Sequence, residues 1–86
     1  MPEISRFFGI SIKMYYGGHA PPHFHAEYGE YKAVIDIHTL VVIGGRLPPR
    51  ALGLIVEWAS QHREELLELW ERAAHHQPLY KLPPLE

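Results

Sequence analysis

The sequence predicts an α+β fold, in which an antiparallel sheet of four to five strands is followed by a long or broken C-terminal helix packed on one face. Up to residue 45, short alternating runs of apolar and polar residues are separated by glycines, as in hairpins. After residue 48, apolar residues recur at steps of three and four, as in an amphipathic helix. With 86 residues we expect one domain at 1–77 and an extended proline-rich tail at 78–86.

The first predicted element is a hairpin. Residues 4–16 are rich in β-branched and aromatic side chains, and the pattern places a turn near Phe8-Gly9. Gly17-Gly18 ends the second strand. Residues 19–22 are predicted to form a loop, because two of them are prolines, which cannot donate to a sheet.

The second hairpin is more sharply defined, because Gly29-Glu30 lies between two alternating runs. Glycine at the first central position predicts a type II′ turn, and that turn sets the pairing of the strands. His23 then lies opposite Asp36, and Glu27 lies opposite Lys32. One face of this hairpin is apolar, and the other carries His23, His25, Glu27, Lys32, Val34 and Asp36.

A last short strand is predicted at residues 40–43, before Gly44-Gly45. The helix should begin at Pro48-Pro49, since proline suits the first turn. One straight helix over residues 48–75 would be about 42 Å long, whereas a domain of this size is about 31 Å across. The helix is therefore expected to bend, to break near residues 60–62, or to overhang the sheet.

An overhanging half of the helix would expose an apolar stripe. Leu66, Leu69 and Trp70 lie in that half, and together they would form a patch of the kind that marks an interface. On this expectation the isolated protein forms a homodimer through the second half of the helix, or buries the stripe against another protein.

The composition excludes several classes of function. The absence of cysteine excludes disulfides, thiolate zinc sites and a cysteine nucleophile. A net charge of -2 with neutral histidines argues against binding polyanions by bulk charge. No apolar run approaches the roughly 20 residues of a membrane span, and the first residues do not resemble a signal peptide. We expect a cytoplasmic protein.

The polar face of the second hairpin is the candidate site. A carboxylate opposite an imidazole can orient it and raise its basicity, so His23, His25 and Asp36 are the candidate catalytic residues. If the first hairpin joins the same sheet, its polar face adds cations, and the candidate phosphate-binding residues are Arg6, Lys13 and Lys32. The alternative is that a half-exposed sheet simply shows polar side chains to water.

A metal site is a further alternative. His19, His23 and His25 could supply imidazole ligands with a carboxylate opposite, a set that suits zinc, nickel or copper. The spacing of these histidines is not a specific signature, so no cofactor is expected by default.

Three segments of the chain carry a family resemblance. They are "MPEISRFFGI", "PPHFHAEYGEYKAVIDI" and "LPPRALGLIVEWASQHREELLELWERA". Together they resemble the small bacterial domain-of-unknown-function family four-one-six-zero. The resemblance implies a bacterial origin, a cytoplasmic location and a second small protein encoded alongside, as in a toxin–antitoxin gene pair. It supplies no catalytic residues.

Two classes of function stay open. One is an interaction module of a toxin–antitoxin-like pair, which binds a cognate small protein, with RNA as a further candidate ligand. The other is a small metal-independent ribonuclease-like toxin that uses His23, His25 and the basic residues of the sheet. The first is favoured, so an enzyme is the less expected outcome.

Overall fold

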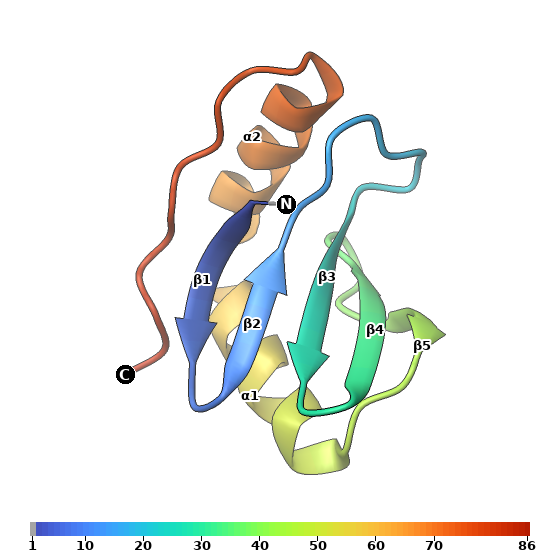
Figure 1. Ribbon diagram of the computed structural model, residues 1–86, viewed down its shortest axis with the longest axis vertical. Coiled ribbons are helices and arrows are strands. Elements are labelled where there is room, and N and C mark those ends of the chain that lie inside the picture. The colour runs from blue at the N-terminus through green and yellow to red at the C-terminus, as the bar shows by residue number, and fades with distance from the viewer. Residues whose placement is uncertain (1) are drawn as a thin grey trace.

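The computed structural model describes residues 2–86 and confirms the α+β fold (Figure 1). Five strands form one antiparallel sheet in the order β1-β2-β3-β4-β5, so every strand pairs with its neighbour in the sequence. Two helices follow the sheet. The elements are β1 (Glu3–Phe7), β2 (Ile10–Lys13), β3 (His23–Tyr28), β4 (Tyr31–Asp36), β5 (Val42–Gly45), α1 (Pro49–Ser60) and α2 (Arg63–Ala74).

The predicted register of the β3–β4 hairpin is confirmed. His23 pairs with Asp36, Glu27 pairs with Lys32, and every pair between them follows. Gly29 has a φ of +59°, as the first central residue of a type II′ turn requires. The turn therefore separates an apolar face from a polar face along both strands.

The β1–β2 hairpin turns at Phe8-Gly9, as predicted, but it contains a bulge. Phe7 pairs with Ile10, whereas the register shifts between Glu3 and Ser5. The shift lets the side chain of Ile4 enter the core, where it is fully buried. It also brings Glu3 opposite Lys13, on the polar side of the sheet.

The last strand lies two residues later than the sequence predicts, since β5 spans Val42–Gly45 rather than 40–43. Asp36 explains why β5 begins later. Its Oδ1 accepts hydrogen bonds from the backbone N–H groups of His38 (2.7 Å) and Thr39 (2.9 Å), which closes a turn after β4. Pairing with β4 resumes only beyond that turn.

Of the three outcomes expected for the helix, the structure shows the break, which removes the exposed stripe. α1 ends at Ser60 and α2 begins at Arg63, so neither helix exceeds the 33 Å length of the molecule. Leu66 and Leu69 are both 0% exposed. The expectation that they overhang the sheet is wrong, because the break turns α2 back onto the core. The expected exposure of these leucines was the reason for a homodimer through this region, and the structure removes that reason.

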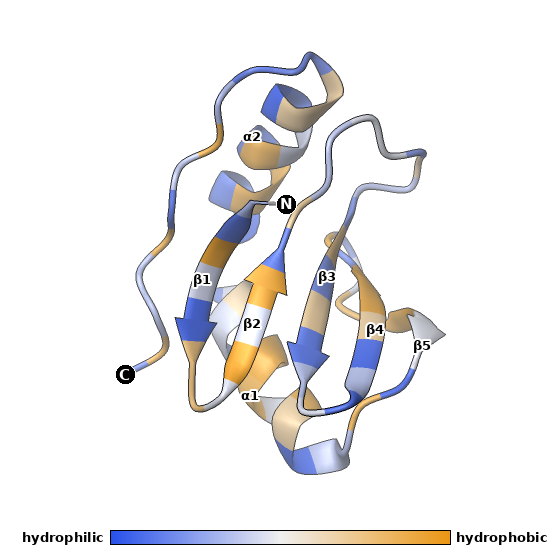
Figure 2. Ribbon diagram, viewed as in Figure 1, coloured by the Kyte–Doolittle hydropathy of each residue, from blue (hydrophilic) through white to orange (hydrophobic). Residues whose placement is uncertain are grey.

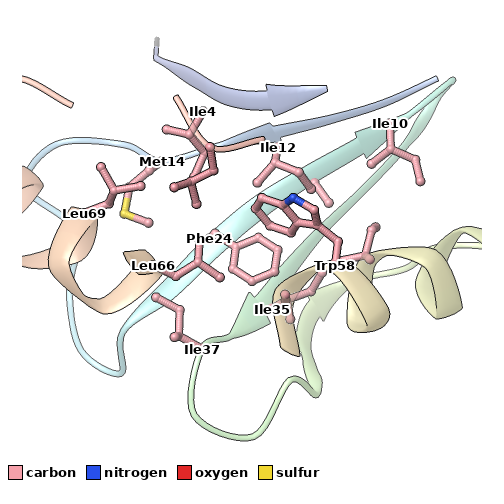
Figure 3. Packing of buried hydrophobic residues seen from close by; sticks show 14 of the residues in the cluster. Ile4, Ile10, Ile12, Met14, Phe24, Ile35, Ile37, Trp58, Leu66 and Leu69 are labelled. Carbon is pink, nitrogen blue, oxygen red and sulfur yellow. The ribbon is translucent and has the colours of Figure 1, made fainter. Parts of the chain in front are cut away.

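The core lies between one face of the sheet and the two helices. Apolar and polar bands alternate along the strands (Figure 2), as expected when only one face is covered. Figure 3 shows Trp58 of α1 and Leu66 of α2 close to Phe24 of β3. The rings of Phe24 and Trp58 meet edge to face, with centroids 6.1 Å apart.

The C-terminal segment has no helix or strand after α2, and it runs beside β1 (Figure 1). The backbone N–H of Leu82 donates to the carbonyl of Ile4 (2.7 Å). The indole Nε1–H of the buried Trp58 donates to the carbonyl of Pro83 (2.8 Å). Leu82 and Leu85 are buried in the core cluster. The tail thus covers the outer edge of β1 and supplies the partner that a buried indole needs.

The adjacent glycines of β5 provide a test of the sheet edge. Gly45 has a φ of +70°, and a Cβ there would lie 2.1 Å from the carbonyl oxygen of Lys32. A Cβ on Gly44 would only reach ordinary contact with Val34, at 3.6 Å. We expect Gly45→Ala to lower the free energy of unfolding by about 1–3 kcal/mol or more, and Gly44→Ala to change it by less than about 0.5 kcal/mol. Urea unfolding of both variants checks this, and equal losses would contradict the structure of β5.

The packing of the tail can be tested at two neighbouring residues. Leu82 is 5% exposed, whereas Lys81 is exposed. We expect Leu82→Ala to lower the free energy of unfolding by about 2–4 kcal/mol, because it removes buried methyl groups and leaves a cavity. Lys81→Ala is the control and should change it by less than about 0.5 kcal/mol. Chemical denaturation measures both, and an unchanged Leu82→Ala protein would show that the tail does not pack on the core.

Candidate functional site

The uncovered face of the sheet carries the candidate site, and we call it the histidine face. The register places Lys13 beside His25 and Ser11 beside Glu27, so both hairpins contribute to one surface as predicted. Tyr15, just beyond β2, packs on it through the ring of His25. The histidine face consists of Glu3, Arg6, Ser11, Lys13, Tyr15, His23, His25, Glu27, Lys32, Val34 and Gly44.

Two of the three predicted phosphate-binding cations are already paired on this face. Arg6 lies 2.8 Å from the carboxylate of Glu3, and Lys13 lies 3.2 Å from that of Glu27. A hydrogen bond from Ser11, together with the guanidinium of Arg6, holds the pKa of Glu3 below its usual value. An incoming phosphate would have to compete with these carboxylates.

Lys32 differs from the other two cations. It lies opposite Glu27 in the register, but its ammonium makes no ion pair within residues 2–86. Of the three predicted phosphate-binding residues, Lys32 is therefore the one whose charge stays available to a ligand.

The predicted pair of His23 and Asp36 does not form, although the two residues are paired in the register. The carboxylate of Asp36 turns away into the loop after β4, where the N–H groups of Thr39 and His38 hold its pKa below the usual value. Nδ1 of His23 instead lies 2.8 Å from the carbonyl of Pro21, so this nitrogen carries the proton and donates it. Asp36 acts as a turn residue and is not placed to orient an imidazole.

His23 is held in a packed cluster at the end of the sheet. Its ring lies 4.9 Å from that of Trp70 and 5.3 Å from that of His25, between ring centroids. A Cβ on Gly18 would fall 2.9 Å from the indole of Trp70, so the absence of a side chain there lets the loop close over α2. Trp70 thus packs against the loop and His23, which explains why it stays outside the central core.

His25 is partly buried beside Tyr15, whose ring meets it edge-on with centroids 4.4 Å apart. Burial lowers the pKa of His25 below its usual value, and the nearby His23 lowers it further, against the opposing effect of Glu27. A shallow depression of about 220 Å³ begins at this histidine. Its lining comprises Tyr15, His25, Ala26, Glu27, Lys32, Ala33, Val34, Gly44 and Gly45.

The depression lacks the parts of an acid–base site. The imidazole of His25 has no carboxylate to orient it, because Asp36 is engaged elsewhere and Glu27 is paired with Lys13. Gly44 pairs with Val34 and has no side chain, so it adds no functional group to the depression. The predicted catalytic residues are therefore divided between a packed aromatic cluster and a loop.

The three-histidine metal site is not assembled. His19 lies on the exposed loop before β3, away from the ring contacts that join His23 and His25. Within the described part of the chain, no group of three or more histidine, aspartate or glutamate side chains is close enough to hold a metal ion.

A second surface, which sequence reasoning missed, lies where both hairpin turns meet the start of α1 (Figure 1). We call it the hairpin-tip surface, and it is made of Phe8, Tyr28, Arg50, Ala51 and Leu54 around a depression of about 410 Å³. Phe8 is 61% exposed and Tyr28 is 38% exposed. The depression is therefore lined by aromatic rings, an aliphatic side chain and one cation.

Phe8 is unfavourable in two ways at this surface, because its backbone is strained and its aromatic ring is exposed. Its φ is +49°, and the following Gly9 has a φ of +79°, as in a type I′ turn. Asparagine, aspartate or glycine normally fill such a position, because a bulky residue is strained there. The sequence signal was a phenylalanine directly before glycine in a two-residue turn, where the aromatic side chain neither relieves the strain nor enters the core.

The titration of His25 predicts a dependence of stability on pH. Because its pKa is lowered on folding, its contribution is complete above about pH 6.5 and is lost as the pH falls towards the folded value. We expect His25→Gln to flatten this decline in urea unfolding measured between about pH 5 and pH 8. Gln77→Ala, at an exposed residue that does not titrate, should leave the profile unchanged. An equal decline in the wild type and His25→Gln would show that His25 is not responsible.

Comparisons with known proteins identify a family but add no activity. Searches of curated proteins and of solved structures find no match. None of the helices in residues 2–86 combines the length and apolar character that a membrane span needs. The family model described as "Domain of unknown function (DUF4160)" matches residues 9–71, which include both candidate surfaces except Arg6, Glu3 and Phe8. Since this match covers most of the 86 residues, the chain belongs to the DUF4160 family.

Proposed function

We propose that the protein is an interaction module of a toxin–antitoxin-like pair and that it binds a cognate small protein through the hairpin-tip surface. The observation that carries this proposal is Phe8. A residue that is both strained and 61% exposed lowers stability without a gain inside the chain. Such a residue is typical of a binding surface, where a partner buries the ring.

The neighbours of Phe8 support the same function. Tyrosine and arginine are enriched at the centres of protein interfaces, and Tyr28 and Arg50 both line the depression beside Phe8. Leu54 adds aliphatic area next to the rings. A partner side chain that enters this depression would bury apolar surface on several sides.

The histidine face gives less support to the other functions expected from the sequence. RNA binding needs a surplus of positive charge, but Arg6 and Lys13 are paired with carboxylates and the net charge is -2. Ribonuclease-like chemistry needs an acid and a base near a phosphate site, but the carboxylate of Asp36 faces away from His23. A protein partner is therefore the best-supported ligand class.

Phe8→Asn separates stability from binding. Asparagine tolerates a positive φ, so we expect this change to raise the free energy of unfolding by about 0.5–2 kcal/mol. We expect it to abolish capture of the small protein encoded by the neighbouring gene, when both are expressed in the native host and recovered proteins are quantified by isotope-labelled mass spectrometry. Binding should be lost although the fold is more stable.

Val41→Asn is the matched control. Val41 is 57% exposed, nearly as much as Phe8, but it lies in the loop before β5 and outside the depression. It should leave the recovered partner unchanged. A partner that is recovered equally with the wild type and Phe8→Asn, or is lost with Val41→Asn alone, would place the binding surface elsewhere.

A further inference from the structure

We infer that the hairpin-tip surface takes an acidic amphipathic segment of the partner protein, with an apolar side chain between Phe8, Tyr28 and Leu54 and a carboxylate at Arg50. This inference rests on the proposed function and names the chemistry of the partner. It follows from which groups surround the depression and which of them lack an ion-pair partner within residues 2–86.

The apolar part of the surface is shaped to hold a side chain. Phe8 belongs to the turn between β1 and β2, Tyr28 to the end of β3, and Leu54 to the second turn of α1. The ring of Tyr28 lies beside the turn itself, because a Cβ on Gly9 would be 3.6 Å from its Cε1. Three separate elements thus border the depression of about 410 Å³, which can receive a leucine or a phenylalanine.

The residues that line this depression carry one positive charge, on Arg50, and no carboxylate. Arg50 makes no ion pair in the part of the chain that the structure describes. The nearest acidic residue along α1 is Glu57, seven positions further, or about 10 Å along the axis. The first turn of α1 also has no acidic residue and no side-chain cap, so its positive end adds to the charge of Arg50. A carboxylate on the partner complements both.

A second copy of the chain fits this surface less well. In a two-fold dimer the same surface of both copies would form one interface, which would then contain two Arg50 side chains. The residues that line the depression include no carboxylate that could separate these charges. A different protein, which can supply that carboxylate, complements the surface better.

Selection from a displayed library of random 16-residue peptides tests the inference on the full-length protein. Peptides are selected on the wild type and counter-selected on Phe8→Asn, and the affinity of the enriched peptides is measured by titration. We expect the enriched peptides to combine apolar residues at helical spacing with glutamate or aspartate. We expect Arg50→Glu to weaken their binding by about tenfold or more, and added salt to weaken it in the wild type.

The variants are chosen so that loss of fold does not explain loss of binding. An acidic residue at the start of a helix is favourable, so Arg50→Glu should remain folded, and urea unfolding checks this. Lys81→Glu reverses an exposed cation on the C-terminal segment, outside the depression, and is the matched control, which should leave peptide affinity unchanged. A ten-nucleotide oligouridylate serves as the nucleic-acid probe and should not bind the hairpin-tip surface.

The outcomes distinguish the two proposals. Enriched peptides that depend on Phe8 but are neutral or basic, or that tolerate Arg50→Glu, would overturn the acidic segment while leaving the protein-binding function intact. Failure to enrich any peptide that depends on Phe8 would overturn both. Oligouridylate binding that Phe8→Asn abolishes would replace a protein segment with single-stranded RNA.

Discussion

The pairing of β3 with β4 is the constraint on which the rest of the structure depends. With Gly29 at the first position of the turn, Phe24 and Ile35 point to one side and His25 and Lys32 to the other. A slip by one residue would move every side chain to the opposite face. The ring of Phe24 then gives Trp58 its place in the core, and the indole in turn holds the tail through Pro83. Core, helices and tail thus follow from one register.

The break between α1 and α2 solves a problem of size. The molecule is 33 Å long. One helix over residues 48–75 would extend beyond it, and the apolar side chains of its second half would be exposed to solvent. Two short helices instead bury Leu66 and Leu69 and leave Trp70 half-buried, with an irregular junction at residues 61–62. There the ring of His62 packs 5.3 Å from Trp58, and its Nδ1 lies 2.8 Å from the carboxylate of Glu65. The apolar stripe is therefore a signal of the core rather than of a dimer interface.

The two surfaces differ in how well the chain satisfies its own groups. On the histidine face most polar groups have partners inside the chain: Glu3 takes Arg6, Glu27 takes Lys13, and His23 donates to Pro21. Such a face is stable by itself and offers a ligand few unpaired polar groups. At the hairpin-tip surface, strain, exposed rings and a cation without a counter-charge coincide. Groups that a chain leaves unsatisfied in this way are more informative about binding than groups that merely belong to reactive residue types.

The sequence by itself determined the α+β class, both hairpin turns and the register of β3 and β4, because these follow from periodicity and turn chemistry. Length limited the helix to a bend, a break or an overhang, and only the structure decided on the break. Only the tertiary structure decided the chemistry of the candidate site. The bulge at Ile4 moved Glu3 onto the polar face, since burial of an isoleucine outweighs a regular ladder. Asp36 turned towards the backbone of Thr39 because two N–H groups a few residues away are closer partners than an imidazole across the strand. Periodicity assigns a residue to a face, but the direction of its side chain depends on the partners that the folded chain brings within reach.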